Sequence, residues 1–216
     1  MKKLTRLAAG LATATAVASA GAIATTAAPA AAAVSGSVYY SANTVTYGQV
    51  LTVHGTSSAT QGKAVLYAKP FHGTWKALAT DTTPASFSWK VRPTKYTQYY
   101  VRVASSSGDV GVTNPHPINV HRKLTRPAVH PKAKTITGKV APAYKKRLVT
   151  IQKRSCSSCA WKKAKVVRTN RWSKWTLRIP VKRMQYRALV AASNGFLKTG
   201  GPITQVVVRY GRTTIS

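Results

Sequence analysis

The stretch Phe87-Ser-Trp-Lys-Val91 alternates apolar and polar side chains, and Trp175-Thr-Leu-Arg-Ile179 repeats this alternation later in the chain. Because successive side chains of a β-strand point to opposite faces, a period of two is typical of an antiparallel strand with one buried face. Similar short runs recur along the chain, separated by clusters of Gly, Pro, Ser and Asn. No helical apolar stripe of useful length follows residue 33. The sequence therefore predicts an all-β protein.

The two alternating stretches belong to two copies of one longer pattern. Equivalent positions lie 83 to 87 residues apart in the pairs Gly55 and Gly138, Val65 and Val149, Trp75 and Trp161, and Tyr99 and Tyr186. Offsets this constant indicate an internal duplication. The same alignment pairs Trp89 with Trp175, so we expect Trp161 and Trp175 to be core residues like their counterparts. About seven short strands per copy predict an antiparallel β-sandwich of the immunoglobulin-like kind.

The predicted fold is thus two tandem immunoglobulin-like β-sandwich domains after a signal peptide. We expect the signal peptide over residues 1–33, the first sandwich over 34–121, a basic linker over 122–132 and the strongly basic second sandwich over 133–212. The linker contains two prolines and four Lys/Arg residues. Since proline fixes φ and lacks a backbone donor, we predict a stiff, extended connector, part of which is a candidate first strand of the second sandwich.

Residues 1–33 have the layout of a secretory signal peptide. Lys2, Lys3 and Arg6 precede an uncharged stretch rich in Ala and Thr, and small-residue cleavage frames end near Ala33. A retained membrane anchor is the alternative, but the stretch is poor in Leu. No other segment reaches the roughly 18 apolar residues that a spanning helix needs. We expect a secreted, extracellular and surface-associated protein with no membrane span after signal removal.

The order of Gly55, the lone Trp75, the alternating stretch 87–91, Pro93 and Thr97-x-Tyr-x-Val101 resembles the bacterial immunoglobulin-like repeats of secreted actinobacterial proteins. This resemblance implies a β-sandwich fold and a role as an adhesive, spacer or carbohydrate- and envelope-associated module rather than as a catalyst. The second copy departs from the pattern in two ways, because it is far more basic and it carries a cysteine pair.

The two copies differ strongly in net charge. The chain has 34 Lys/Arg residues against two acids, Asp81 and Asp109, so its formal net charge is +32. Seven of the basic residues and both acids lie in residues 34–121, which leaves +5, whereas residues 122–216 hold 24 basic residues and no acid. A cationic surface without counter-charges repels itself, so its natural partner is a polyanion.

Few residues are suited to catalysis or metal binding. The usual route of glycoside hydrolysis needs two carboxylates beside the bond, and the two acids here lie in a turn and in a Ser/Gly loop. The chain has no G-x-S-x-G stretch, and its five histidines lack the spacing of a metal site. We predict that the protein is not an enzyme and has no cofactor and no metal site.

The two cysteines form the motif Cys156-Ser-Ser-Cys159 in the hairpin loop of the second copy. A C-x-x-C motif is redox-active at the start of a helix in a βαβ unit, and a zinc site needs a second cysteine pair. The flanks here are strands and no further cysteine exists. In an oxidising compartment we predict a local disulfide between Cys156 and Cys159 that fixes the shape of a basic loop.

The candidate polyanion-binding surface consists of basic side chains of the second copy together with one tryptophan. Its predicted members are Lys145, Lys146, Arg147, Lys153, Arg154, Lys162, Lys163, Lys165, Arg168, Arg171, Trp172, Lys182 and Arg183, with Lys174 and Arg187 as further basic positions. Trp172 lies in a basic turn and has no counterpart in the first copy. An extra Trp there suggests stacking on a sugar or a base, and packing back over the sandwich edge is the alternative.

These features predict a non-enzymatic binding or adhesive protein of the cell envelope. Its basic second domain is expected to bind anionic polymers, such as a wall polymer or a polysaccharide. One alternative is non-specific binding of extracellular nucleic acid through the same electrostatics. The other is a structural spacer with no specific ligand. The oligomeric state is left open.

Overall fold

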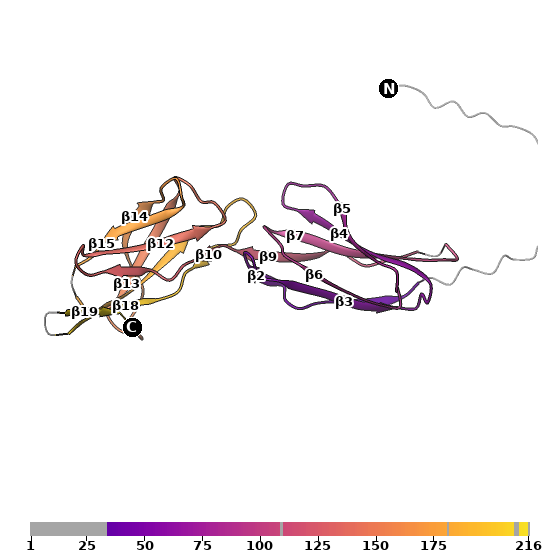
Figure 1. Cartoon of the computed structure of the whole chain (residues 1–216), viewed down its shortest axis with the longest axis horizontal. Coiled ribbons are helices and arrows are strands. Elements are labelled where there is room, and N and C mark those ends of the chain that lie inside the picture. Colours follow the sequence, from indigo (N-terminus) through magenta and orange to yellow (C-terminus); the bar gives the residue numbers. More distant parts are fainter. Residues whose placement is uncertain (1–33, 109, 181, 210–211, 216) are drawn as a thin grey trace, which may run out of the picture. The chain divides into compact units, whose positions relative to one another are not determined.

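The computed structural model describes residues 34–108, 110–180, 182–209 and 212–215, and every regular element in this part of the chain is a β-strand (Figure 1). The predicted all-β class is therefore confirmed. The predicted signal peptide, residues 1–33, lies outside the described residues. The described residues include no helix with the length and apolarity needed to cross a bilayer.

The first sandwich consists of a small and a large sheet. The small sheet has the strand order β1 (Gly36–Tyr40), β3 (Leu51–Ser57) and β6 (Ser86–Val91). The large sheet has the order β2 (Thr44–Thr46), β9 (His116–His121), β7 (Thr97–Ser105), β4 (Gly62–Pro70) and β5 (Lys76–Asp81), with β8 (Val110–Val112) beside β7. Fully buried Leu51, Leu66 and Ile118 contribute to the core that these strands form.

The second sandwich repeats this arrangement. Its small sheet has the order β10 (Lys123–Leu124), β12 (Thr135–Ala141) and β11 (Ala128–His130), with β15 (Lys174–Arg178) also paired to β12. Its large sheet has the order β14 (Lys162–Arg168), β13 (Leu148–Arg154), β16 (Met184–Val190), β18 (Thr204–Arg209) and β19 (Arg212–Ile215), with β17 (Thr199–Gly200) beside β16. Ile136, Ile151 and Tyr186 are buried in its core.

Both sandwiches follow the same path through their two sheets. The chain passes from β3 in the small sheet to β4 in the large one, returns to the small sheet at β6 and crosses again to β7. In the second sandwich β12, β13, β15 and β16 take the same course. Mainly antiparallel strands connected in this manner between two sheets form an immunoglobulin-like sandwich. The predicted fold of two tandem immunoglobulin-like sandwiches is confirmed.

In each small sheet one glycine makes room for a buried aromatic ring of the neighbouring strand. Gly55 lies opposite Phe87 and Gly138 lies opposite Trp175. A Cβ atom on Gly138 would lie 2.5 Å from Trp175 Cζ2, and one on Gly55 would lie 2.7 Å from the Phe87 ring. The structural counterpart of Trp175 is therefore Phe87. The predicted pairing of Trp175 with Trp89 is wrong, although Trp175 is a core residue as expected, with 2% of its surface exposed.

The strands β4 and β13 also align differently from the prediction. The inward side chains are Ala64 and Leu66 in β4 and Val149 and Ile151 in β13. Val149 thus corresponds to Ala64 and not to Val65. A shift of one residue moves every side chain to the opposite face of a strand, so burial decides the register where sequence similarity does not.

The segment predicted as a linker, residues 122–132, contributes strands to the second sandwich. Its strands β10 and β11 both pair with β12. Leu124 and Val129 are buried in the second core, and the Thr204 hydroxyl donates a 2.7 Å hydrogen bond to the Pro127 carbonyl. Pro127 separates the two short strands and Pro131 follows the second one. The segment is not a free connector, because Leu124 and Val129 enter the second core.

A loop of the second repeat, residues 191–198, packs against the first sandwich, and the described residues of both sandwiches belong to one compact unit. Phe196 belongs to the core of the first sandwich, with 8% of its surface exposed. The backbone N–H of Leu197 donates to the carbonyl of Val120 at 2.9 Å. The guanidinium carbon of buried Arg122 lies 4.0 Å from the Phe196 ring centroid and 4.6 Å from that of Tyr144.

Candidate functional site

Strand pairing divides the predicted basic surface into two groups at opposite ends of the β13–β14 hairpin. The first group comprises Lys145, Lys146, Arg147, Arg168, Arg171 and Trp172, which lie before β13, at the end of β14 and in the turn that follows it. The second group comprises Lys153, Arg154, Lys162, Lys182 and Arg183, which lie near the disulfide loop and before β16. Lys163 and Lys165 lie between the groups on β14. At about 3.3 Å per residue, the length of β13 separates the first group from the second by roughly 20 Å.

Hydrogen bonds between side chains and the backbone hold the first group in place. Arg168 Nη1 donates to the carbonyl of Lys146 at 2.7 Å, and the N–H of Arg147 donates to the Thr169 hydroxyl at 3.0 Å. The N–H of Tyr144 donates to the Ser173 hydroxyl at 2.7 Å. These bonds connect the turn before β13 to the turn after β14. The lysines of the group are exposed, so the scaffold presents their charges to solvent.

Trp172 is exposed at the tip of its turn. The Asn170 side chain shapes this turn, because its Oδ1 atom accepts hydrogen bonds from the N–H groups of Trp172 and Lys174. The Trp172 ring keeps 57% of its surface exposed, and Arg171 Cζ lies 3.9 Å from its centroid. A ring so placed is accessible to a sugar or base instead of being packed over the sandwich edge.

The second group surrounds a disulfide-bonded loop. Cys156 and Cys159 are joined as predicted, and the Cys159 N–H donates to the Cys156 carbonyl. Trp161 follows this loop and is half-buried, outside the second core. The prediction that Trp161 is a core residue is therefore wrong. Its ring lies instead against Arg154 and Arg187, whose Cζ atoms are 4.5 and 4.3 Å from the ring centroid.

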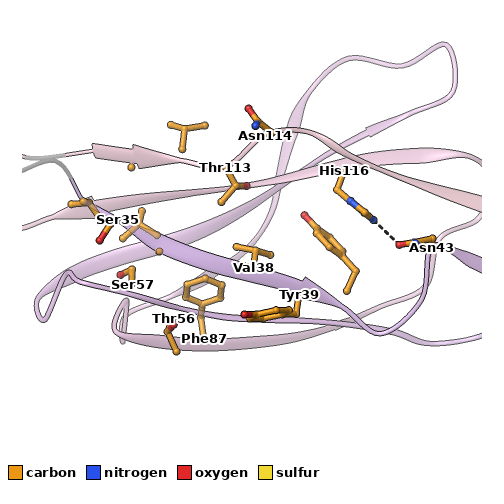
Figure 2. A pocket seen from close by; sticks show the side chains of 16 residues that line it. Ser35, Val38, Tyr39, Asn43, Thr56, Ser57, Phe87, Thr113, Asn114 and His116 are labelled. Atoms are coloured by element: carbon orange, nitrogen blue, oxygen red, sulfur yellow. Dashed lines mark hydrogen bonds between the residues drawn. The ribbon is translucent and has the colours of Figure 1, made fainter.

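The first sandwich contains a pocket that sequence reasoning missed. Its volume is about 670 Å³, and it lies between β1 and the β8–β9 side of the large sheet (Figure 2). Hydroxyl and amide side chains such as Ser35, Thr56, Thr113 and Asn114 line it, with Phe87 at its base. Because these residues come from positions up to 79 apart in the chain, no local pattern marks the pocket. Its size is in the range of small-ligand sites.

Tyr40 and His116 form the aromatic wall of this pocket. Their rings stack with centroids 4.3 Å apart. Figure 2 shows the contact of His116 with Asn43, in which Nε2 lies 2.9 Å from Oδ1. Burial, with a smaller contribution from Tyr99, raises the pKa of Tyr40 to about 12. The Tyr40 hydroxyl therefore stays protonated at neutral pH. The pocket offers hydroxyl and amide groups, which suit the hydroxyl groups of an uncharged ligand better than a polyanion.

The acidic and histidine side chains are engaged locally. Asp81 accepts hydrogen bonds from the hydroxyl and the N–H of Thr83, which lowers the pKa of its carboxyl. His121 contacts the Thr199 hydroxyl and His130 contacts that of Thr137. Within the described ranges, no three His, Cys, Asp or Glu side chains gather in a way that could hold a metal ion. Asp109 lies outside the described residues.

Comparisons with known proteins give no family. No family model and no curated protein matches the sequence. Among solved structures, a tetra-tandem repeat from the extending region of a large adhesion protein matches 80% of this chain with 15% identity and a TM-score of 0.38. A marsupial T cell receptor matches 80% of this chain with 10% identity and a TM-score of 0.35. The matched region spans 49% of the adhesion-protein chain and 72% of the receptor chain.

Proposed function

We propose that this chain is a secreted, non-enzymatic adhesive module of the cell envelope whose second sandwich binds anionic polymers. The observation that carries the proposal is the absence of counter-charge, since residues 122–216 contain 24 Lys/Arg residues and no acid. Solubility asks for a net charge of only about 2–8 in a small domain. A surface that greatly exceeds this value and cannot neutralise itself is suited to an external polyanion.

The placement of the cations supports the same proposal. Lys162, Lys163 and Lys165 are exposed along β14, where Lys163 and Lys165 connect the second basic group, which includes Lys162, to the first. A polymer that follows β14 meets charge over a length of roughly 20 Å, which is the span of several sugar or nucleotide units. The secretory layout of residues 1–33 favours an extracellular polymer, such as a wall polymer or a polysaccharide, over an intracellular one.

Salt dependence of binding tests this proposal. We expect the protein to bind both polygalacturonate and duplex DNA at low salt, with log affinity falling linearly as log salt rises. Replacing Lys162, Lys163 and Lys165 with Gln should weaken binding and make the slope for DNA shallower by nearly one for each phosphate that the variant no longer neutralises. The matched control replaces Lys63, Lys76 and Lys90, which are exposed lysines of the first sandwich, with Gln.

The control decides between a localised surface and bulk attraction. Equal losses in both triple variants would show that net charge alone attracts the polymer and that the second sandwich has no special part. If the protein binds no polyanion at low salt, the proposed function is wrong and the role of a structural spacer replaces it.

Trp172→Ala adds a readout that charge does not supply. If the exposed ring stacks on a sugar or base, its removal should cost about 1–3 kcal/mol of binding free energy at every salt concentration and leave the slope unchanged. If the folded variant keeps wild-type affinity at high salt, the Trp172 ring does not contribute to binding.

A further inference from the structure

The outer face of the large sheet in the second sandwich carries two arginines that are held in fixed orientations. Arg154 on β13 lies opposite Gln185 on β16, and its Nε donates to Gln185 Oε1 at 2.6 Å. In the next row Arg187 on β16 lies opposite Gln152, and its Nε donates to Gln152 Oε1 at 2.8 Å. Trp161 covers both guanidinium groups at 4.3–4.5 Å. We call these five residues the Trp161 ledge.

The first sandwich shows that the fold does not require two arginines at this place, since it has a single cation there, Lys69 opposite Gln98. Tyr67 and Tyr100 occupy the register positions that Gln152 and Arg187 occupy in the second sandwich. Their rings stack with centroids 4.8 Å apart, and Trp75 packs edge-on against Tyr100 at 4.7 Å. Lys69 Nζ also lies 5.9 Å from the Trp75 ring centroid. A tryptophan after the hairpin loop is therefore supported by an aromatic pair and one lysine in one copy and by two guanidinium groups in the other. Structural support therefore accounts for one cation beside the ring but not for the second one, Arg187, which replaces Tyr100.

The ledge leaves the anion-binding atoms of both arginines available. Each Nε is used by a glutamine, whereas the described residues make no hydrogen bond to a terminal Nη atom of Arg154 or Arg187. Arginine binds carboxylate and phosphate through a planar fork, and the ring and the glutamine hold each fork in one orientation. Ordering the two side chains before binding reduces the entropy that a ligand has to offset.

The same residues favour a sugar polymer over a nucleic acid. Single-stranded nucleic acid binds where successive bases stack on exposed aromatic faces. The Trp161 ring is half-buried and lies against guanidinium groups. Each glutamine carbonyl accepts from an arginine, which leaves the amide N–H groups of Gln152 and Gln185 as neutral donors beside the cations. Neutral donors next to a cationic fork match a unit that carries both hydroxyl and anionic groups.

We infer that the Trp161 ledge is a binding site for the carboxylate or phosphate group of an anionic polysaccharide. This inference rests on the proposed function and locates its specific contact at one end of the β13–β14 hairpin. The lysines of β14 attract the polymer through long-range charge, and the ledge recognises one anionic unit through hydrogen bonds of defined geometry.

The test uses the full chain with Arg154→Lys and Arg187→Lys combined. This double variant keeps the net charge but removes both planar forks. At about 0.15 M salt we expect a roughly tenfold or greater loss of affinity for polygalacturonate, a carboxylate polymer, or for phosphomannan, a phosphate polymer. The polymer that shows the loss identifies the anionic group. Affinity for duplex DNA should change less than about twofold, because its non-specific binding depends on charge.

A second variant guards against a folding defect. Gln152→Tyr with Arg187→Tyr rebuilds the aromatic support of the first sandwich under Trp161, and we expect the same loss of sugar-polymer affinity with thermal unfolding close to that of wild type. Lys139→Gln is the matched control, since it removes one exposed charge from the other sheet.

The outcomes separate this inference from the proposed function. Wild-type affinity for both sugar polymers in both ledge variants, with weaker binding in the β14 lysine variant, would overturn the ledge and keep the proposed function. An equal loss for DNA and for the sugar polymers would overturn the assignment to a polysaccharide. A wild-type protein that binds no polyanion would overturn both.

Discussion

Tyr40 and Tyr99 are the side chains whose ionisation is most clearly linked to folding of the first sandwich. Burial raises the pKa of each hydroxyl to about 12 from an ordinary value of 10.0. The Tyr40 hydroxyl also donates to the backbone carbonyl of Tyr99 at 3.4 Å. The folded protein therefore keeps two protons that the unfolded chain releases above pH 10.

This difference predicts alkaline destabilisation with a defined window. The stabilising contribution of the two neutral hydroxyls is fully present below pH 10 and is lost as pH rises from 10 toward 12. In Tyr40→Phe with Tyr99→Phe, the free energy of unfolding should fall less steeply over this window than in wild type. Denaturant unfolding at a series of pH values measures this difference in slope.

Tyr39→Phe is the control, because this neighbouring side chain is 60% exposed and should retain the wild-type pH dependence. A double variant whose stability falls as steeply as that of wild type would show that the two buried hydroxyls do not titrate with folding.

At the scale of the elements, pairs of strands in the small sheets depend on one glycine each. On β12, Gly138 lies beneath the ring of Trp175 on β15, a ring that is itself buried on all sides by the second core. An added Cβ at Gly138 would lie 2.5 Å from Cζ2 and 2.7 Å from Cε2 of that ring. Because protein cores are close-packed, we expect neither the ring nor the strand to move without cost.

Gly138→Ala is therefore expected to lower the free energy of unfolding by about 1–3 kcal/mol through overpacking. Chemical denaturation followed by tryptophan fluorescence measures the change. The control is Gly200→Ala on β17, where the nearest atom to the added Cβ is Leu189 Cδ1 at 4.0 Å. Equal stability of the two variants would mean that the small sheet adjusts its spacing without cost.

At the scale of the whole molecule, Phe196 connects the second repeat to the first core. Its ring centroid lies 6.4 Å from that of Tyr47, and the adjacent Gly195 carbonyl accepts a 2.7 Å hydrogen bond from the N–H of Tyr96. The first sandwich thus includes a side chain that follows its own last strand by some 75 residues. Residues 34–121 by themselves would lack this part of their core.

We expect Phe196→Ala to destabilise the protein by about 3–5 kcal/mol, the usual cost of removing a buried phenylalanine. The loss should appear in the unfolding of the first sandwich although the substitution lies in the second repeat. Leu197→Ala is the matched control, because its side chain is 37% exposed. Unfolding of the Phe196 variant at the wild-type denaturant concentration would show that the loop rests on the first sandwich without stabilising it.

Much of the fold could be predicted from local features of the chain. Alternation in 87–91 and 175–179 depends on neighbouring residues, so it identified strands and their buried faces. The duplication and the split in charge were equally visible, as was the Cys156–Cys159 disulfide, whose two residues are close in sequence. The exposed lysines of the candidate surface also followed from composition, because charged side chains seldom enter a core.

The tertiary structure decided what depends on register and on contacts between distant segments. It placed Trp161 on the outer face against Arg154 and Arg187, brought Gln152 and Gln185 beside them, and divided the basic surface between two ends of a hairpin. It also inserted Phe196 into the other repeat's core. Periodicity specifies which face a side chain takes, but a shift of one residue between strands changes its neighbours, and only packing of the complete chain selects that register.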